Sequence, residues 1–189
     1  MYLNSEKGIK VDDATAIKAI LAGDKAAFRN IVRMYEKRLY GIIYRIVHSQ
    51  QDAEDIMQGT FLAAYNKLNT FKGDSSLFTW LVAIAYNNIR QYMRKQRWQR
   101  CLSLEVDILD IENKSVKPDK LEKEELGIIL QNALIKLPLK LRTVLMLYEV
   151  EELEHKTIAE IMGCSVGTVW SYLSRAKAQL RKLLMRIYE

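Results

Sequence analysis

The stretch that decides the fold is HKTIAEIMGCSVGTVWSYLSRAKAQL, residues 155–180. Its first part places apolar side chains at helical spacing, and Gly163 follows, where the positive φ of a helix C-terminus is tolerated. Ser165 can then cap a longer helix whose apolar side chains recur every three or four residues. A short helix, a tight glycine turn and a longer helix together predict a helix-turn-helix.

The polar face of the longer helix is the candidate DNA-reading surface. Side chains near its start lie off the apolar stripe, where recognition helices reach base edges in the major groove. The candidate contacts to duplex DNA are Thr168, Trp170, Ser171, Ser174, Arg175 and Lys177. An ordinary helical hairpin with a solvated basic face is the alternative interpretation.

The composition of the 189-residue chain favours an all-α fold. Hydrophobic residues make up 49%, enough for real cores, while 8 glycines and 2 prolines are few for a turn-rich sheet protein. No segment approaches the roughly 18 apolar residues that span a bilayer, and the N-terminus lacks the apolar core of a secretion signal. We therefore expect no membrane insertion and a cytoplasmic location.

Charge divides the chain into blocks that the net charge of +6 conceals. Residues 71–100 carry six basic side chains and one acidic, residues 101–125 four basic and eight acidic, and residues 126–189 nine basic and six acidic. This distribution suggests two nucleic-acid-facing modules with a linker between them. We expect an extension with a short helix at 1–25, helical domains at 26–100 and 126–189, and a flexible acidic linker at 101–125.

Apolar spacing predicts the helices of the first domain. They are expected at 14–22, at 26–47 with Asp24 as its cap, at 53–68 opened by Asp52, and at about 77–97 after a loop. The acidic side chains Asp52, Glu54 and Asp55 lie in a first turn, where carboxylates complement the helix dipole. Docking onto a basic partner is the other interpretation of this turn.

Aromatic and basic side chains are mixed in residues 71–100. Rings that stack on unpaired bases, beside cations that follow the backbone, are typical of single-stranded DNA binding. Trp80 lies at helical spacing with Leu81 and Ile84, so we expect it in the core. The side chains that better fit an exposed face are Tyr86, Asn87, Arg90 and Arg94.

Enzymatic chemistry has little support in the sequence. The chain has two histidines and two cysteines, and neither cysteine lies in the spacing of a zinc site. Phosphate-binding glycine loops and nucleophile-elbow motifs do not occur. We therefore expect no catalytic residue, no bound metal and no cofactor.

Three strings resemble bacterial sigma factors. DAEDIMQGTF, residues 52–61, and FKGDSS, residues 71–76, followed by TWL, resemble region 2 of that family. Leu137-Pro138 and the helix-turn-helix after it resemble region 4. The short linker between the two is similar to that of the extracytoplasmic-function (ECF) subgroup of the sigma-70 family.

The resemblance implies a non-enzymatic protein that binds core RNA polymerase, directs it to promoters and helps to melt the DNA. Docking on the β′ clamp coiled coil would use Asp52, Glu54, Asp55, Gln58 and Phe61. The separated −10 strand would meet Phe71, Lys72, Tyr86, Asn87, Arg90, Arg94 and Lys95, with Asn87 reading a base. The helix-turn-helix would read the −35 duplex and meet the β flap, and an anti-sigma factor would hold the protein inactive.

The sequence departs from the family pattern at three positions. Gly59 stands where Glu is usual, and Trp170 and Tyr172 stand where Lys or Arg is common. Trp170 can pack on a thymine methyl or bind a partner. A helix-turn-helix regulator that works without polymerase, and an adaptor of helical hairpins, are the alternative functions.

Overall fold

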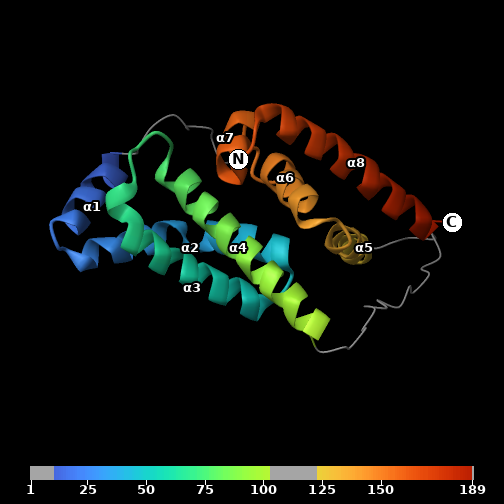
Figure 1. Cartoon of the computed structure of the whole chain (residues 1–189), viewed down its shortest axis with the longest axis horizontal. Helices are drawn as coiled ribbons and strands as arrows, with labels where there is room; N and C mark the ends of the chain where they lie inside the picture. The colour runs from blue at the N-terminus through green and yellow to red at the C-terminus, as the bar shows by residue number, and fades with distance from the viewer. Residues whose placement is uncertain (1–10, 103–122, 189) are drawn as a thin grey trace. The chain divides into compact units, whose positions relative to one another are not determined.

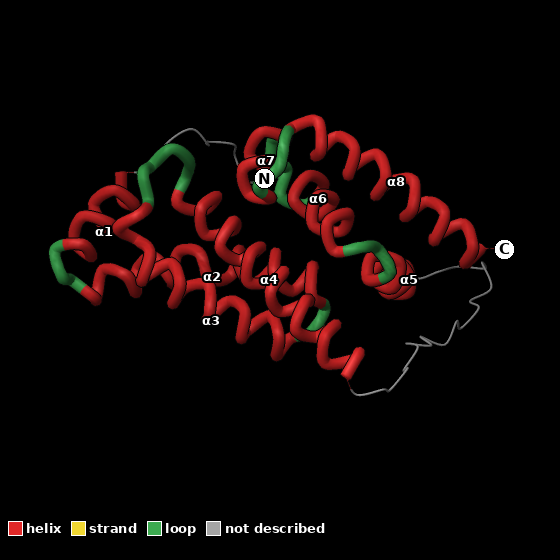
Figure 2. The backbone as a smooth tube through the Cα atoms, in the orientation of Figure 1, coloured by secondary structure: helices red, strands yellow, loops and turns green. Residues whose placement is uncertain are grey.

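The computed structural model describes residues 11–102 and 123–188 of the chain. Every regular element within these ranges is helical, and Figure 2 shows helices and connecting loops only. The described residues fall into two helical units, residues 11–102 and residues 123–188. This confirms the expected all-α fold, whereas the predicted linker lies mostly outside the described residues.

The first unit begins with α1 (Val11–Leu21), α2 (Lys25–Val47) and α3 (Gln50–Lys67). A 3-10 turn, η1 (Leu68–Thr70), leads through a loop to α4 (Leu77–Leu102). Helix α2 packs against both α1 and α3, and the four helices can be followed from blue to green in Figure 1.

The helix starts of this unit follow from short-range hydrogen bonds. The Asp24 carboxylate accepts from the backbone N–H groups of Ala26 and Ala27, at 2.9 and 3.3 Å, as expected for a cap. Helix α3 begins at Gln50, earlier than the predicted start after Asp52. Its cap is Ser49, whose hydroxyl accepts a hydrogen bond from the Asp52 N–H. His48 ends α2 in the left-handed region, with φ at 58°, so the chain turns at once into α3.

The core of the first unit joins α1, α2 and α4. Its largest fully buried side chains include Leu39, Ile43, Leu77 and Leu81. The Tyr35 ring stacks on Phe78 with centroids 5.7 Å apart, which ties α2 to α4. Fixing α4 in this way sets which of its faces remains open.

The second unit consists of α5 (Lys123–Ile135), α6 (Leu139–Glu149), α7 (His155–Met162) and α8 (Val166–Tyr188), labelled in Figure 1. Helix α8 packs against α5 and α6. Side chains of α6, α7 and α8, among them Val144, Leu147, Ile158 and Val169, are fully buried. Ile158 and Val169 belong to the apolar stripes that the sequence predicts for the helix-turn-helix.

The turn between α7 and α8 has the geometry that the sequence predicts. Gly163 has a φ of +62°, its N–H donates to the Glu160 carbonyl, and the Cys164 N–H donates to the Ala159 carbonyl at 3.0 Å. This pair of bonds is a Schellman motif, which glycine allows at the lowest cost. Ser165 Oγ then accepts from the Thr168 N–H at 3.2 Å and caps α8.

Candidate nucleic-acid and partner interfaces

The start of α3 presents an acidic surface. Asp55 and Gln58 are exposed, and Asp52 and Glu54 are half-buried. Glu54 accepts a hydrogen bond from the Gln50 side chain at 3.0 Å. Across residues 11–102 and 123–188, no ion pair of Asp52 or Asp55 is found, so these carboxylates are available to a basic partner.

An exposed leucine extends this surface along α3. Leu62 is 64% exposed and follows Asp55 and Gln58 at the spacing of one helix stripe. A polar stripe with one exposed carboxylate that ends in a large exposed apolar side chain suits a protein partner better than it suits solvent. Leu62 was not among the contact residues predicted from the sequence, although it lies seven residues after Asp55 and so on the same helix face.

Phe61 does not belong to the exposed surface, which corrects its predicted role. The side chain is buried, and its ring meets Phe28 of α2 edge to face, with centroids 6.5 Å apart. Phe61 therefore supports α3 from beneath and is not itself placed to touch a partner.

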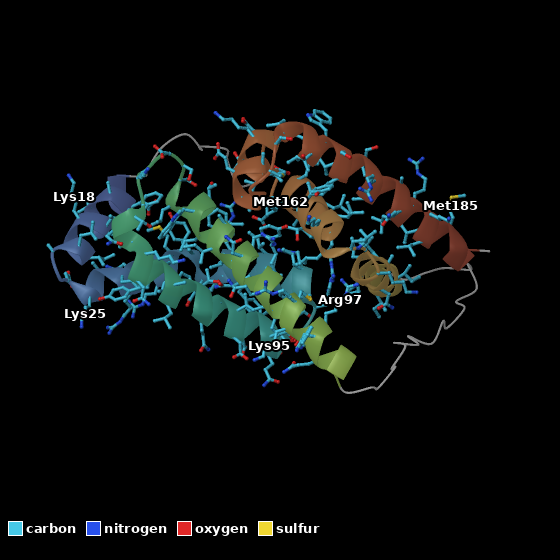
Figure 3. The ribbon with its side chains drawn as sticks, viewed as in Figure 1. Lys18, Lys25, Lys95, Arg97, Met162 and Met185 are labelled. Carbon is cyan, nitrogen blue, oxygen red and sulfur yellow. The ribbon has the colours of Figure 1, made fainter. Side chains whose placement is uncertain are left out.

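Helix α4 carries a basic stripe. Asn87, Arg90 and Arg94 are exposed at spacings of three and four, so they share one face, and Lys95 is exposed beside them. Figure 3 labels Lys95 and Arg97 toward the end of this helix. In the part of the chain that the structure describes, no ion pair of Arg90, Arg94 or Lys95 is found. The stripe is therefore free to meet phosphates.

Tyr86 is not on this face, contrary to the prediction. The side chain is only 3% exposed, because it lies one helical turn from the buried Val82 and Ile89 and faces the same way. Its ring lies under the Arg90 guanidinium, 5.7 Å from centroid to carbon. Tyr86 can thus steady Arg90 but cannot stack on a base.

The start of α4 differs from the prediction in one respect. Trp80 is half-buried and not fully in the core, and its ring lies 5.2 Å from that of the half-buried Phe71. Lys72 is exposed beside them. The loop and the first turn of α4 together therefore offer a partly accessible aromatic pair next to a cation.

A buried hydrogen-bond chain fixes α4 on α3. Asn88 donates to Thr60 Oγ1 at 3.1 Å, and that hydroxyl donates to the Ile56 carbonyl at 2.7 Å. Thr60 is fully buried, so these bonds are costly to break. They hold the register of the neighbouring Asn87, and sequence analysis did not foresee them.

Most of the side chains predicted to contact duplex DNA are exposed on α8. Trp170, Ser171, Ser174 and Arg175 are exposed. Thr168 is half-buried, and its hydroxyl shares a 2.9 Å hydrogen bond with the Ser165 hydroxyl. Part of the hydrogen-bonding capacity of Thr168 is therefore used within the helix cap.

Lys177, a predicted contact to duplex DNA, has a partner within the second unit. Its Nζ lies 2.7 Å from the Glu149 carboxylate and 5.3 Å from the centre of the Tyr148 ring. The hydrogen bond to Glu149 raises the pKa of Lys177. Both side chains are half-exposed, and such pairs are weak and screened by salt.

The described residues contain no cluster of three or more His, Cys, Asp or Glu side chains that could hold a metal ion. In the same residues, each helix is too short or too polar to cross a bilayer.

Comparison with known proteins gives two family matches. The model of Sigma-70 region 2 matches residues 31–99, and the model of Sigma-70 region 4 matches residues 128–180. The RNA polymerase sigma-H factor of Pseudomonas aeruginosa is 34% identical over 181 residues, covering 91% of this chain and 93% of that protein. The ECF RNA polymerase sigma-E factor of Escherichia coli K12 is 34% identical over 177 residues, covering 89% and 92%.

Two solved structures have a similar fold. The sigma factor RpoE of Bartonella quintana, crystallised with the anti-sigma factor NepR, matches with a TM-score of 0.67 at 26% identity, covering 84% of this chain and 96% of that one. CnrH, solved with the cytosolic domain of CnrY, matches with a TM-score of 0.66 at 24% identity, covering 93% and 98%.

Proposed function

The chain belongs to the sigma-70 family as an ECF sigma factor, and from this premise we propose how its surfaces divide the work of initiation. The acidic surface of α3 docks core RNA polymerase on the β′ clamp coiled coil. The basic stripe of α4 takes the unpaired −10 strand, and α8 enters the −35 duplex while the apolar side of its unit meets the β flap.

The observation that carries this proposal is the separation of unpaired charge on the first unit. At the start of α3 Asp55 is exposed and two more carboxylates are half-buried, and cations are exposed on α4, with no ion pair found for either set in the described residues. Acidic and basic surfaces on one small unit suit two partners of opposite charge. A basic polymerase segment and a DNA backbone are such partners.

Recognition of the −10 element rests on Asn87 and its neighbours. An exposed amide can both donate to and accept from a base edge, while Arg90, Arg94 and Lys95 follow the phosphates. Turning a base out of the stack costs a few kcal/mol, which stacking and phosphate contacts must offset. Since Tyr86 is buried, the stacking surface is assigned to Phe71 and Trp80.

Recognition of the −35 element rests on the start of α8. Arg175 can form a bidentate contact with guanine. The hydroxyls of Ser171 and Ser174 can form hydrogen bonds with base edges that donate or accept. All three are exposed on a helix that a Schellman turn and a serine cap hold in place.

Regulation by an anti-sigma factor is part of the proposal. The similar sigma factor of Bartonella quintana was crystallised with such a partner. In this chain the acidic stripe ending at Leu62 offers a surface that an inhibitor could cover in place of polymerase. The protein acts in the cytoplasm, where polymerase and promoters are found.

Run-off transcription with purified core polymerase tests the proposal. The chain should add initiation at specific members of a promoter library, and Asp55→Lys should weaken binding to core polymerase while leaving −35 duplex binding intact. Duplex binding without any added initiation would favour the helix-turn-helix regulator instead. Equal loss of both activities in Asp55→Lys would contradict the assigned division between α3 and α8.

A further inference from the structure

Three aromatic rings from three helices form a stack beside the recognition helix. The rings of Tyr148, near the end of α6, and His155, at the start of α7, have centroids 4.9 Å apart and are tilted by 49°, so they are in contact but not parallel. The His155 ring and the Trp170 ring of α8 are 4.0 Å apart and within 13° of parallel. The imidazole is therefore held between two larger rings and covers one face of the indole.

Stacking is the main restraint on the imidazole. His155 Nε2 is buried and has no hydrogen-bond partner among the described residues. On the far side, Lys177 lies over the Tyr148 ring and pairs with Glu149. The row of rings thus ends at the cation Lys177 and joins α6, α7 and α8.

Trp170 is 60% exposed despite this contact. With one face covered by His155, the indole keeps one open face and its edge. A ring that inserts between base pairs needs both faces, so intercalation would require the stack to break. A fixed indole instead offers a flat apolar surface, at a place on α8 where base edges are reached.

The major groove has one apolar group, the C5 methyl of thymine. We propose that Trp170 determines specificity by packing its open face on a thymine methyl of the −35 element, and that His155 is the positioning residue that holds the indole. This inference rests on the proposed function, because it needs α8 in the −35 major groove. Holding the ring in place before binding reduces the conformational entropy lost on contact.

Deoxyuridine substitution tests the contact, because it removes only the methyl group. A −35 sequence is first selected from a randomised promoter library with the reconstituted holoenzyme, and each thymine is then replaced in turn. Wild-type holoenzyme should lose about fourfold in affinity at one position, the change expected for exposing one buried methyl-sized group. Trp170→Ala should bind the thymine duplex more weakly and lose nothing further with deoxyuridine.

His155 variants separate positioning from mere structural support. His155→Ala should reduce the methyl effect, and His155→Phe, which keeps a stacking ring, should restore it. A purely structural role would lower affinity for the thymine and deoxyuridine duplexes equally. Tyr172→Ala is the matched control, because Tyr172 lies on the other flank of α8, near Lys140, and its loss should leave the methyl effect intact.

Two results would overturn the inference. One is a selected −35 element without an invariant thymine, and the other is a methyl effect that persists in Trp170→Ala. Either could occur while promoter-specific transcription is intact, which would leave the proposed function standing. A holoenzyme that selects no promoter at all would instead refute the proposed function.

Discussion

Replacing Tyr35 with phenylalanine should lower the stability of the first unit. The Tyr35 hydroxyl donates to both carboxylate oxygens of Asp13, at 3.0 and 2.8 Å, and so joins α2 to α1. Asp13 is only 2% exposed, which leaves its carboxylate little access to water. The substitution keeps the aromatic ring that stacks on Phe78 and removes the donor.

The size of the effect follows from the burial of Asp13. A buried acceptor that loses its donor costs about 1–3 kcal/mol, and more when it is charged. We therefore expect Tyr35→Phe to lower the free energy of unfolding by about 2–3 kcal/mol. Adding Asp13→Ala should recover part of this loss, because removing both members of a buried hydrogen bond costs less than removing one.

The same pair predicts a dependence on pH. Burial, and then the hydrogen bond to Asp13, raise the pKa of Tyr35 above its ordinary value of 10.0. The unfolded chain therefore releases this proton at a lower pH than the folded chain does. The contribution of Tyr35 to stability is full below about pH 10 and falls as the pH rises above it. Tyr35→Phe should lack this component.

Hydrogen exchange followed by mass spectrometry measures the loss in the full chain. Peptides from α1 and α2 should exchange faster in Tyr35→Phe than in the wild type, while peptides from α5 to α8 serve as the internal control. Equal protection of α1 and α2 in both proteins would refute the argument that this hydrogen bond holds α1 in place.

Four further substitutions test other parts of the structure. Gly59→Ala should raise the free energy of unfolding, measured by urea denaturation, by up to about 1 kcal/mol, because alanine favours a helix interior more than glycine does. The added Cβ meets only Asn88 Nδ2, at 4.0 Å, so there is room for it. Gly163→Ala should lower the free energy of unfolding, since φ at this residue is +62°. A less stable Gly59→Ala or a more stable Gly163→Ala would contradict the argument for that residue. Arg94→Ala should reduce the salt slope of single-stranded −10 binding by about 0.7, and an unchanged slope would exclude a phosphate contact. Arg175→Ala should cost about 1–3 kcal/mol at one −35 base pair in competition assays, whereas a uniform loss over all sequences would exclude base reading.

Features set by nearby residues were predictable from the sequence. Asp24 caps α2, and Gly163 and Ser165 form the turn and cap of the helix-turn-helix, because each acts on backbone groups a few residues away. The exposure of Asn87 and Arg175 also followed from their places opposite the apolar stripes.

Features set by the packing of distant segments were not predictable in the same way. The inward face of α4 is wide enough to include Tyr86, and α2 covers Phe61, so two predicted contact residues are buried. The Lys177–Glu149 pair and the Asn88–Thr60 bond join residues 28 apart in sequence. Helical spacing shows that a side chain faces a neighbour but does not identify that neighbour.

Permanganate footprinting of unpaired thymines tests the central claim most directly. On a selected promoter, core polymerase and this chain together should make thymines of the −10 element reactive, and neither should do so alone. Asn87→Ala should weaken that reactivity without removing −35 duplex binding. Duplex binding by the chain with no reactive thymines, on any promoter selected with core polymerase, would contradict the account.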